Sequence, residues 1–212
     1  MNGIIGRKLG MTRLFEDDGR VVPVTVIEAG PCPVLHVSDV AKGSKAVQLG
    51  FGLRKAKRTT RAELGHAKRA GLEGAPAVLR SLPLPAGIEV APGDVVTVQI
   101  FQPGDSVKVT GTTKGRGFQG VVKRHGFRGG PATHGSTRYR KPGSMGAGTD
   151  PSRVIKGKRL PGQTGSKRHT AVGLSVVRVD SENNLLYVKG AVPGPLEGVV
   201  LVRKQGGRGR YA

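Results

Sequence analysis

The chain contains 212 residues, with 35 Lys and Arg against 14 Asp and Glu, which gives a formal net charge of +21 at pH 7. So large an excess of positive charge repels itself in a folded protein, and it is typical of proteins whose partner is a polyanion, most often nucleic acid. The apolar runs are far shorter than the roughly 20 residues that cross a bilayer, which excludes an integral membrane protein, and no basic amphipathic helix is long enough to lie on a membrane surface.

The single cysteine, Cys32, cannot form an intrachain disulfide or build a site of several thiolates, so a reducing compartment is expected. Residues 1–8 contain no apolar stretch of signal-peptide length, which predicts that the protein works where it is made, in the cytoplasm. No metal or other cofactor is expected.

Short β-branched runs separated by Gly, Pro and Asp predict strands in the first half of the chain. These runs are residues 21–27, 34–37, 46–49, 95–101 and 107–109. One helix interrupts them, because Thr60 and Glu63 match a capping box and Gly71 suits the position after the last turn. A small helical insert is therefore predicted near residues 58–72.

The sequence changes character between residues 111 and 170. Fourteen residues there are basic and only Asp150 is acidic, so about a quarter of the chain carries a charge of +13. The same stretch is rich in Gly and Pro, and it cannot bury enough apolar surface by itself to offset its ordering entropy. Within it, residues 118–124 predict a short helix with Phe118, Val121 and Val122 on one face.

Strand patterns resume after residue 170. Residues 174–179 and 185–188 flank a turn-forming stretch at 180–184, which predicts a hairpin, and residues 199–202 predict a last strand. The basic, Gly-rich residues 203–210 predict a tail that stays disordered until it meets phosphate.

The predicted organisation is mainly β with minor α content. Strands on both sides of the basic segment indicate one globular β domain, residues 1–110 with 171–212, from which residues 111–170 extend as a long irregular loop. Its Gly and Pro residues permit close backbone approach, and Phe118, Phe127 and Tyr139 offer stacking surfaces among the cations. Because the chain contains no recognition helix, zinc finger or basic zipper, folded RNA is a better partner for this loop than duplex DNA.

The candidate RNA-contact residues are the cations of this segment, which would bind phosphate, and its histidines and Tyr139, which could stack on bases. They are Lys114, Arg116, Lys123, Arg124, His125, Arg128, His134, Arg138, Tyr139, Arg140, Lys141, Arg153, Lys156, Lys158, Arg159, Lys167, Arg168 and His169.

Two motifs in the segment have rival interpretations. Residues 115–120 match the GxGxxG spacing of dinucleotide-binding turns, but no acidic residue follows about twenty positions later and no alternating βα units are present. Glycines for close approach to RNA backbone, or plain flexibility, explain the pattern better. His125 and His134 could in principle cleave RNA, but Asp150 is the one acid in the segment that could orient a base. A non-enzyme is therefore predicted. An RNA-processing or nucleotide-dependent enzyme is the main rival, and a nonspecific DNA binder is the second.

Several stretches resemble the large-subunit ribosomal protein L-three family in its bacterial form. They are residues 3–15, 109–124, 132–135 and 142–144, and the resemblance continues through residues 188–194. It implies a β-barrel of the translation-protein common-domain type, direct binding to 23S rRNA, and a part in nucleating assembly of the large subunit. Ribosomal proteins fourteen and nineteen of the subunit are implied as neighbours, and no small-molecule substrate is implied.

The resemblance also implies that the loop tip supports the region of the peptidyl transferase centre. The tip residues would be Gly143, Ser144, Met145, Gly146, Ala147, Gly148, Thr149 and Asp150. Thr149 stands where some bacterial members carry a methylated Gln, so that modification is not expected. Lys108 replaces a common Asp or Asn, which adds positive charge at the base of the loop and is expected to alter a local turn or contact.

Overall fold

The computed structural model describes residues 1–40, 44–85 and 87–205. It is mainly β with few helices, which confirms the predicted class. The chain divides into two compact units, residues 1–112 with those from 168 onward, and residues 113–167. The sequence indicated a basic segment at 111–170, whereas residues 111–112 and 168–170 belong to a strand ladder of the first unit. Arg168 and His169 pair there with Thr112 and Gly111, and Thr170 pairs with Thr110. Among the described residues, no helix is long and apolar enough to span a membrane.

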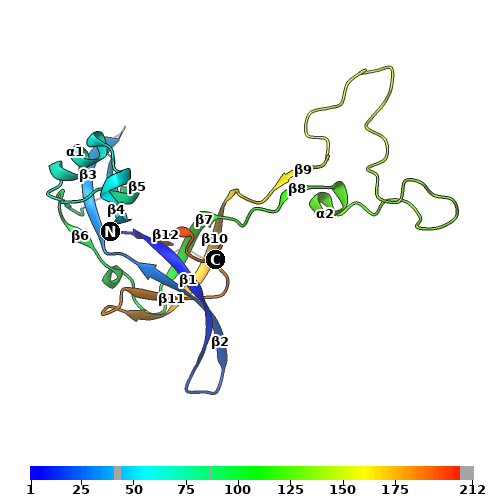
Figure 1. The fold of residues 1–212 in the computed structure, drawn as a ribbon. Coiled ribbons are helices and arrows are strands. Elements are labelled where there is room, and N and C mark those ends of the chain that lie inside the picture. Colours follow the sequence, from blue (N-terminus) through cyan, green and yellow to red (C-terminus); the bar gives the residue numbers. More distant parts are fainter. Residues whose placement is uncertain (41–43, 86, 206–212) are drawn as a thin grey trace. The chain divides into compact units, whose positions relative to one another are not determined.

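Six antiparallel strands of the first unit form a closed barrel (Figure 1). In ring order they are β1 (Gly3–Phe15), β12 (Val199–Lys204), β7 (Ser106–Thr112), β10 (Arg168–Asp180), β11 (Leu185–Lys189) and β2 (Val21–Ala29). The ring closes because β2 pairs with β1 on one side and with β11 on the other. Closure pairs the backbone N–H and C=O groups that the edge strands of an open sheet would leave exposed.

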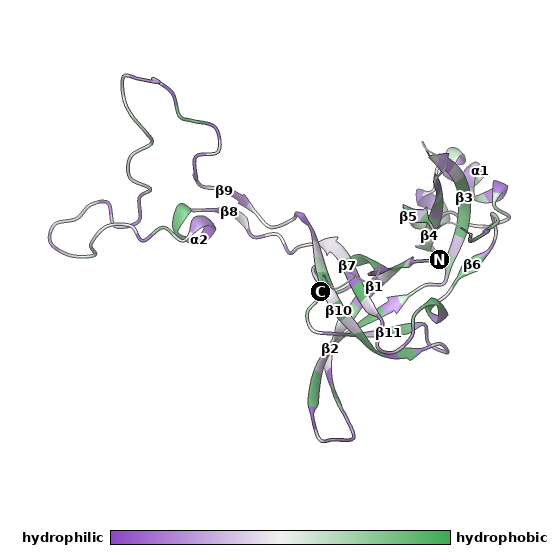
Figure 2. Ribbon diagram, turned by 180° about the vertical axis from the view of Figure 1, so that it is seen from behind, coloured by the Kyte–Doolittle hydropathy of each residue, from purple (hydrophilic) through white to green (hydrophobic). Residues whose placement is uncertain are grey.

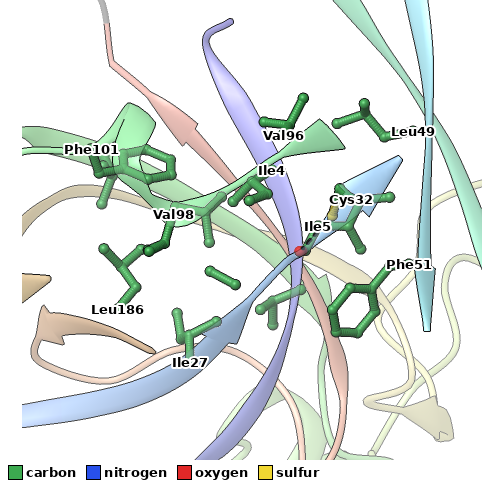
Figure 3. Packing of buried hydrophobic residues seen from close by; sticks show 14 of the residues in the cluster. Ile4, Ile5, Ile27, Cys32, Leu49, Phe51, Val96, Val98, Phe101 and Leu186 are labelled. Carbon is green, nitrogen blue, oxygen red and sulfur yellow. Dashed lines mark hydrogen bonds between the residues drawn. The ribbon is translucent and has the colours of Figure 1, made fainter. Parts of the chain in front are cut away.

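Strand alternation explains which side chains fill the barrel. Val107 and Val109 of β7 are fully buried, as is Val202 of β12, whereas Lys108 between the two valines and Arg203 after Val202 are only half-buried. Figure 3 shows Ile4 and Ile5 of β1 among apolar side chains from several strands, with the sulfur of Cys32 beside the backbone of Ile5. The Cys32 thiol donates to the carbonyl oxygen of Ile5 at 3.3 Å.

A second sheet has the order β5–β4–β3–β6. Its strands are β3 (Cys32–Val40), β4 (Ser44–Leu53), β5 (Pro76–Leu84) and β6 (Val95–Val96). The run 95–101 is thus a strand only at its start, since Val98–Ile100 form a 3-10 turn, η3. That part of the prediction was wrong because Val98 and Phe101 are buried in the core in an irregular segment, where apolar residues look the same in sequence as in a strand.

The predicted helix is present as α1 (Arg61–Arg69), after a 3-10 turn, η2 (Ala56–Arg58). The Thr60 side chain accepts from the Glu63 amide and the Glu63 carboxylate accepts from the Thr60 amide, so the capping box is confirmed. Gly71 follows with a positive φ of 74°, as the sequence indicated. The hairpin at 180–184 is also confirmed, with the Asp180 carboxylate accepting from the amides of Glu182 and Asn183.

The second unit contains little regular structure. Its elements are β8 (Gly117–Gln119), α2 (Val121–His125) and β9 (Gly162–Thr164). The predicted helix at 118–124 was wrong at its start, because Phe118 belongs to β8 and is 73% exposed, while Val121 is buried. Figure 2 shows the long loop between α2 and β9 mostly in hydrophilic and neutral colours.

Candidate nucleic-acid interface

The basic segment starts as a two-armed stem. Thr113 donates its amide to the carbonyl oxygen of Lys167 at 2.9 Å, and the Lys167 amide donates to the Thr113 hydroxyl at 3.2 Å. Further along, the Arg116 amide donates to Thr164, and β8 pairs with β9 from Gly117 opposite Thr164 onward. These bonds keep the outgoing and returning arms side by side (Figure 1).

Helix α2 holds the returning arm at the end of this stem. The Arg124 guanidinium donates to the carbonyl oxygen of Leu160 at 2.6 Å, and His125 Nε2 donates to the same oxygen at 3.1 Å. The helix ends at His125 and is capped by Gly126, whose φ of 71° is left-handed, and its first residue, Val121, is buried. Arg124 and His125, both predicted as RNA contacts, therefore have partners inside the segment.

Two glycines of the segment are required by close backbone approach. At Gly129 a Cβ atom would overlap the carbonyl oxygen of Tyr139, and at Gly165 it would overlap that of Lys114; both residues have a φ of 77°. Gly115 of the GxGxxG stretch lies against Ser166, with only 2.7 Å between the hydroxyl and the position of a Cβ. The absence of a side chain at Gly115 therefore leaves room for Ser166 of the returning arm, whereas a Cβ at Gly117 or Gly120 would face open space.

The tip residues 143–150 are all exposed. The Ser144 hydroxyl donates to the carbonyl oxygen of Gly146 at 3.1 Å and accepts from its amide at 3.3 Å, which makes a tight local turn. The Ser152 hydroxyl donates to the carbonyl oxygen of Thr149. Gly146 has a φ of 145°, and neither it nor Gly148 has a neighbour within reach of a Cβ, so the tip presents backbone rather than side-chain bulk.

Positive charge dominates the segment surface. Residues 113–167 contain 13 Lys and Arg and one acid, Asp150, which gives a net charge of +12. All the candidate RNA-contact residues are exposed except Arg124 and His125, which are half-buried. No ion pair involves residues 113–167, whereas the ion pairs of the described chain, such as Arg7 with Glu28, lie in the first unit. The cations of the segment are therefore not neutralised within the protein.

The candidates do not all lie in one unit. Arg168 and His169 belong to β10 of the barrel, opposite Thr112 and Gly111, while the other candidates belong to residues 113–167. His134 lies in the exposed loop with a φ of 58°. Among the described residues, no cluster of three or more His, Cys, Asp and Glu could hold a metal ion.

One basic feature was not predicted from the sequence. Exposed cations gather on η2 and α1 and beside them; they are Lys55, Lys57, Arg58, Arg61, Lys68 and Arg69. The run Arg54 to Arg58 in the sequence was a usable signal for them. Lys108 was expected to alter a local turn or contact. It lies within the β7 ladder opposite Arg203, so its position is a strand contact and not a turn.

Comparison with known proteins decides the class. A family model described as Ribosomal protein L3 matches residues 88–184, which include the whole basic segment. Large ribosomal subunit protein uL3 of Geobacter metallireducens is 50% identical over 202 residues, which cover 95% of this chain and 96% of the relative. The protein of the same name from Herpetosiphon aurantiacus is 51% identical over 207 residues, which cover 96% of each chain. The chain belongs to the ribosomal protein L3 family.

Membership of the L3 family confirms the resemblance noted in the sequence. It identifies the chain as a structural ribosomal protein and not an enzyme, which removes the nucleotide-cofactor and RNA-cleaving interpretations. It also agrees with the expected location in the ribosome. The basic segment thus lies within the part of the chain that the family model matches, and it is not a catalytic site.

Proposed function

We propose that this protein is built into the large ribosomal subunit by direct binding to 23S rRNA, and that residues 113–167 carry most of this binding. The observation that supports it best is the unbalanced charge of the segment, +12 with no ion pair of its own. Phosphates of folded RNA would supply the missing negative charge. The named relatives, which are large-subunit proteins, support the same assignment.

The irregular structure of the segment suits the space between packed RNA helices better than the groove of a duplex. Its regular elements are short, and the long loop from Gly126 to Pro161 has backbone free to approach phosphates. Exposed Phe118 and Tyr139 provide stacking surfaces, at 73% and 52% exposure. In this proposal Arg124 and His125 shape the segment, and the remaining exposed cations contact the RNA.

The tip would support the region of the peptidyl transferase centre. Residues 143–150 are exposed, small and turned by the Ser144 hydrogen bonds, which suits a place where bulk would press on nucleotides. The barrel would be of the translation-protein common-domain type, and ribosomal proteins fourteen and nineteen would be neighbours. In this role the protein helps nucleate assembly of the subunit by ordering rRNA.

Filter binding to 23S rRNA across a range of salt concentrations tests the central part of the proposal. The variant changes Arg138, Arg140 and Lys141 to Gln. It removes three exposed cations whose side chains form no hydrogen bond or ion pair with a described residue. If each contacts a phosphate, the magnitude of the slope of log K against log salt falls by about 2–3.

The matched control changes Arg13, Lys45 and Lys189 to Gln. These are exposed cations of the first unit that lie outside the η2 and α1 cluster, and their side chains form no hydrogen bond or ion pair with a described residue. The proposal expects a clearly smaller change in slope for this control. Equal changes for the two triple variants would contradict a specific role for the segment and would indicate general attraction to polyanions.

A further inference from the structure

A small basic pocket lies on the outer face of the barrel, where three neighbouring strands meet. In the ladder, Arg203 of β12 lies between Gly3 of β1 and Lys108 of β7, directly opposite both. Residues directly opposite in neighbouring strands point to the same face of a sheet. Because Gly3 has no side chain, its place on this face is open to the side chain of Arg203.

The stem of Arg203 occupies that place. A Cβ on Gly3 would lie 2.7 Å from Cγ of Arg203 and 3.3 Å from Leu82 of β5, so the arginine stem is packed between the barrel and the second sheet. Arg203 Nε is buried and, among the described residues, donates no hydrogen bond. A buried donor of a charged group without an acceptor is costly, and native structures rarely leave one without a reason.

The described charged residues that line the pocket beside this donor are all basic. Asn2, Gly3, Leu82, Lys108, Arg203 and Lys204 help to line a pocket of about 190 Å³, and none of its described lining residues is acidic. Lys204 is matched by Asp105, whose carboxylate lies 2.7 Å from its ammonium. Neither Lys108 nor Arg203 forms an ion pair with a described residue, and like charges directly opposite each other destabilise a ladder.

We propose that Lys108 and Arg203 form a site for one phosphate group. A phosphate would accept from Arg203 Nε, neutralise the repulsion between the two cations, and fit a volume several times the roughly 30 Å³ of a water molecule. The phosphate could come from the RNA backbone, which rests on the proposed function, or from free inorganic phosphate, which does not. The two sources are separated by two arms of one experiment on the full chain.

The first arm measures thermal unfolding with added inorganic phosphate against potassium chloride of equal ionic strength. Lys108→Gln should keep or raise the Tm in chloride, because it removes the repulsion, and should lose part of the rise that phosphate gives. Arg203→Lys, which keeps the charge and removes Nε, should lose it too. At phosphate concentrations ten times Kd the wild-type chain should gain about 3–6 °C more than these variants.

The controls are Lys189→Gln, which matches Lys108→Gln, and Arg13→Lys, which matches Arg203→Lys. Both positions are exposed, and their side chains form no hydrogen bond or ion pair with a described residue. They correct for the general effect of phosphate on a chain of charge +21. The controls should respond to phosphate as the wild-type chain does.

The second arm measures binding to 23S rRNA by filter binding. An RNA phosphate in the pocket predicts that Lys108→Gln weakens binding about fivefold to twentyfold and lowers the salt slope by about 0.7–0.9, with little change in the controls. Loss of the phosphate response without loss of RNA binding supports the site and assigns it to a free anion.

Both variants behaving like their controls in both arms would overturn the proposal. The separate failure of the proposed function would appear in the Arg138, Arg140 and Lys141 variant, if it bound 23S rRNA as its own control does. The two failures are therefore distinguishable.

Discussion

The Arg124 guanidinium of helix α2 donates to the carbonyl oxygen of Leu160, 36 residues later in the chain, at 2.6 Å. His125 Nε2 donates to the same oxygen, so two side chains of one short helix hold the returning arm of the basic segment. These residues are half-buried, unlike the other cations and histidines of the segment. Part of its positive charge thus shapes the segment, while the rest remains available to a partner.

Arg124→Met should loosen the stem. A hydrogen bond from a charged donor contributes about 1.5–3 kcal/mol to stability, and for a half-buried side chain we take about 1 kcal/mol. Its loss should raise the equilibrium constant for local opening of the stem about fivefold. Amide hydrogen exchange of residues 117–119 and 162–164 should speed up by that factor. Arg128→Met, at an exposed cation without a described partner, should leave these amides unchanged. Equal exchange in both variants would show that the bond does not hold the arms together.

Gly165→Ala should disturb the base of the segment far more than Gly157→Ala. Both glycines have positive φ, 77° and 84°, so each substitution meets the cost of about 1–2 kcal/mol of a left-handed conformation. Only at Gly165 would the new Cβ overlap a backbone atom, the carbonyl oxygen of Lys114, whereas Gly157 faces open space. Hydrogen exchange at Thr113 and Arg116 measures the difference, and similar protection in the two variants would be contrary to this packing.

How much of this could be predicted depends on how local each signal is. The capping box of Thr60 and Glu63 and the turn at 180–184 were predicted because their hydrogen bonds join residues within a few positions. Closure of the barrel pairs Ile4 with Val202, and no local pattern indicates that partnership.

The candidate site shows the same division. Its charge and exposure followed from composition, because cations without nearby acids stay at the surface. The internal role of Arg124 depends on the approach of Leu160, and the pairing of Lys108 with Arg203 depends on strand register. Neither is visible in one sequence, since both depend on contacts between residues distant in the chain.

Acid should destabilise the first unit. The pKa of Glu63 is lowered from its ordinary 4.5, first by the Thr60 backbone amide, and the pKa values of Asp105 and Asp180 are lowered from 3.8, chiefly by Lys204 and Asn183 respectively. A carboxyl with a lowered folded pKa stabilises the fold above its ordinary pKa, and this contribution is lost as pH falls through the lowered value. The urea midpoint should therefore fall below about pH 4, and Glu63→Gln should weaken that dependence. A midpoint constant from pH 6 to pH 2.5 would contradict these assignments.

The Cys32 thiol should be inert in the native protein. Burial raises its pKa to about 12, so almost no thiolate exists at pH 8, and the side chain is fully buried in the core. Labelling with iodoacetamide should be at least a hundredfold slower in buffer than in 8 M urea. Stoichiometric labelling of the folded chain at the rate of a free thiol would disprove its place in the core.

Retention on ribosomes in high salt tests the central claim most directly. Ribosomes carrying the wild-type chain, or the variant with Arg138, Arg140 and Lys141 changed to Gln, are washed at about 0.5–1 M salt and sedimented through a gradient. If residues 113–167 are embedded in rRNA, the wild-type chain stays with the large subunit, and the variant is released more readily than its control with Arg13, Lys45 and Lys189 changed to Gln. Quantitative release of the wild-type chain, with equal rebinding to unrelated RNA, would contradict the account.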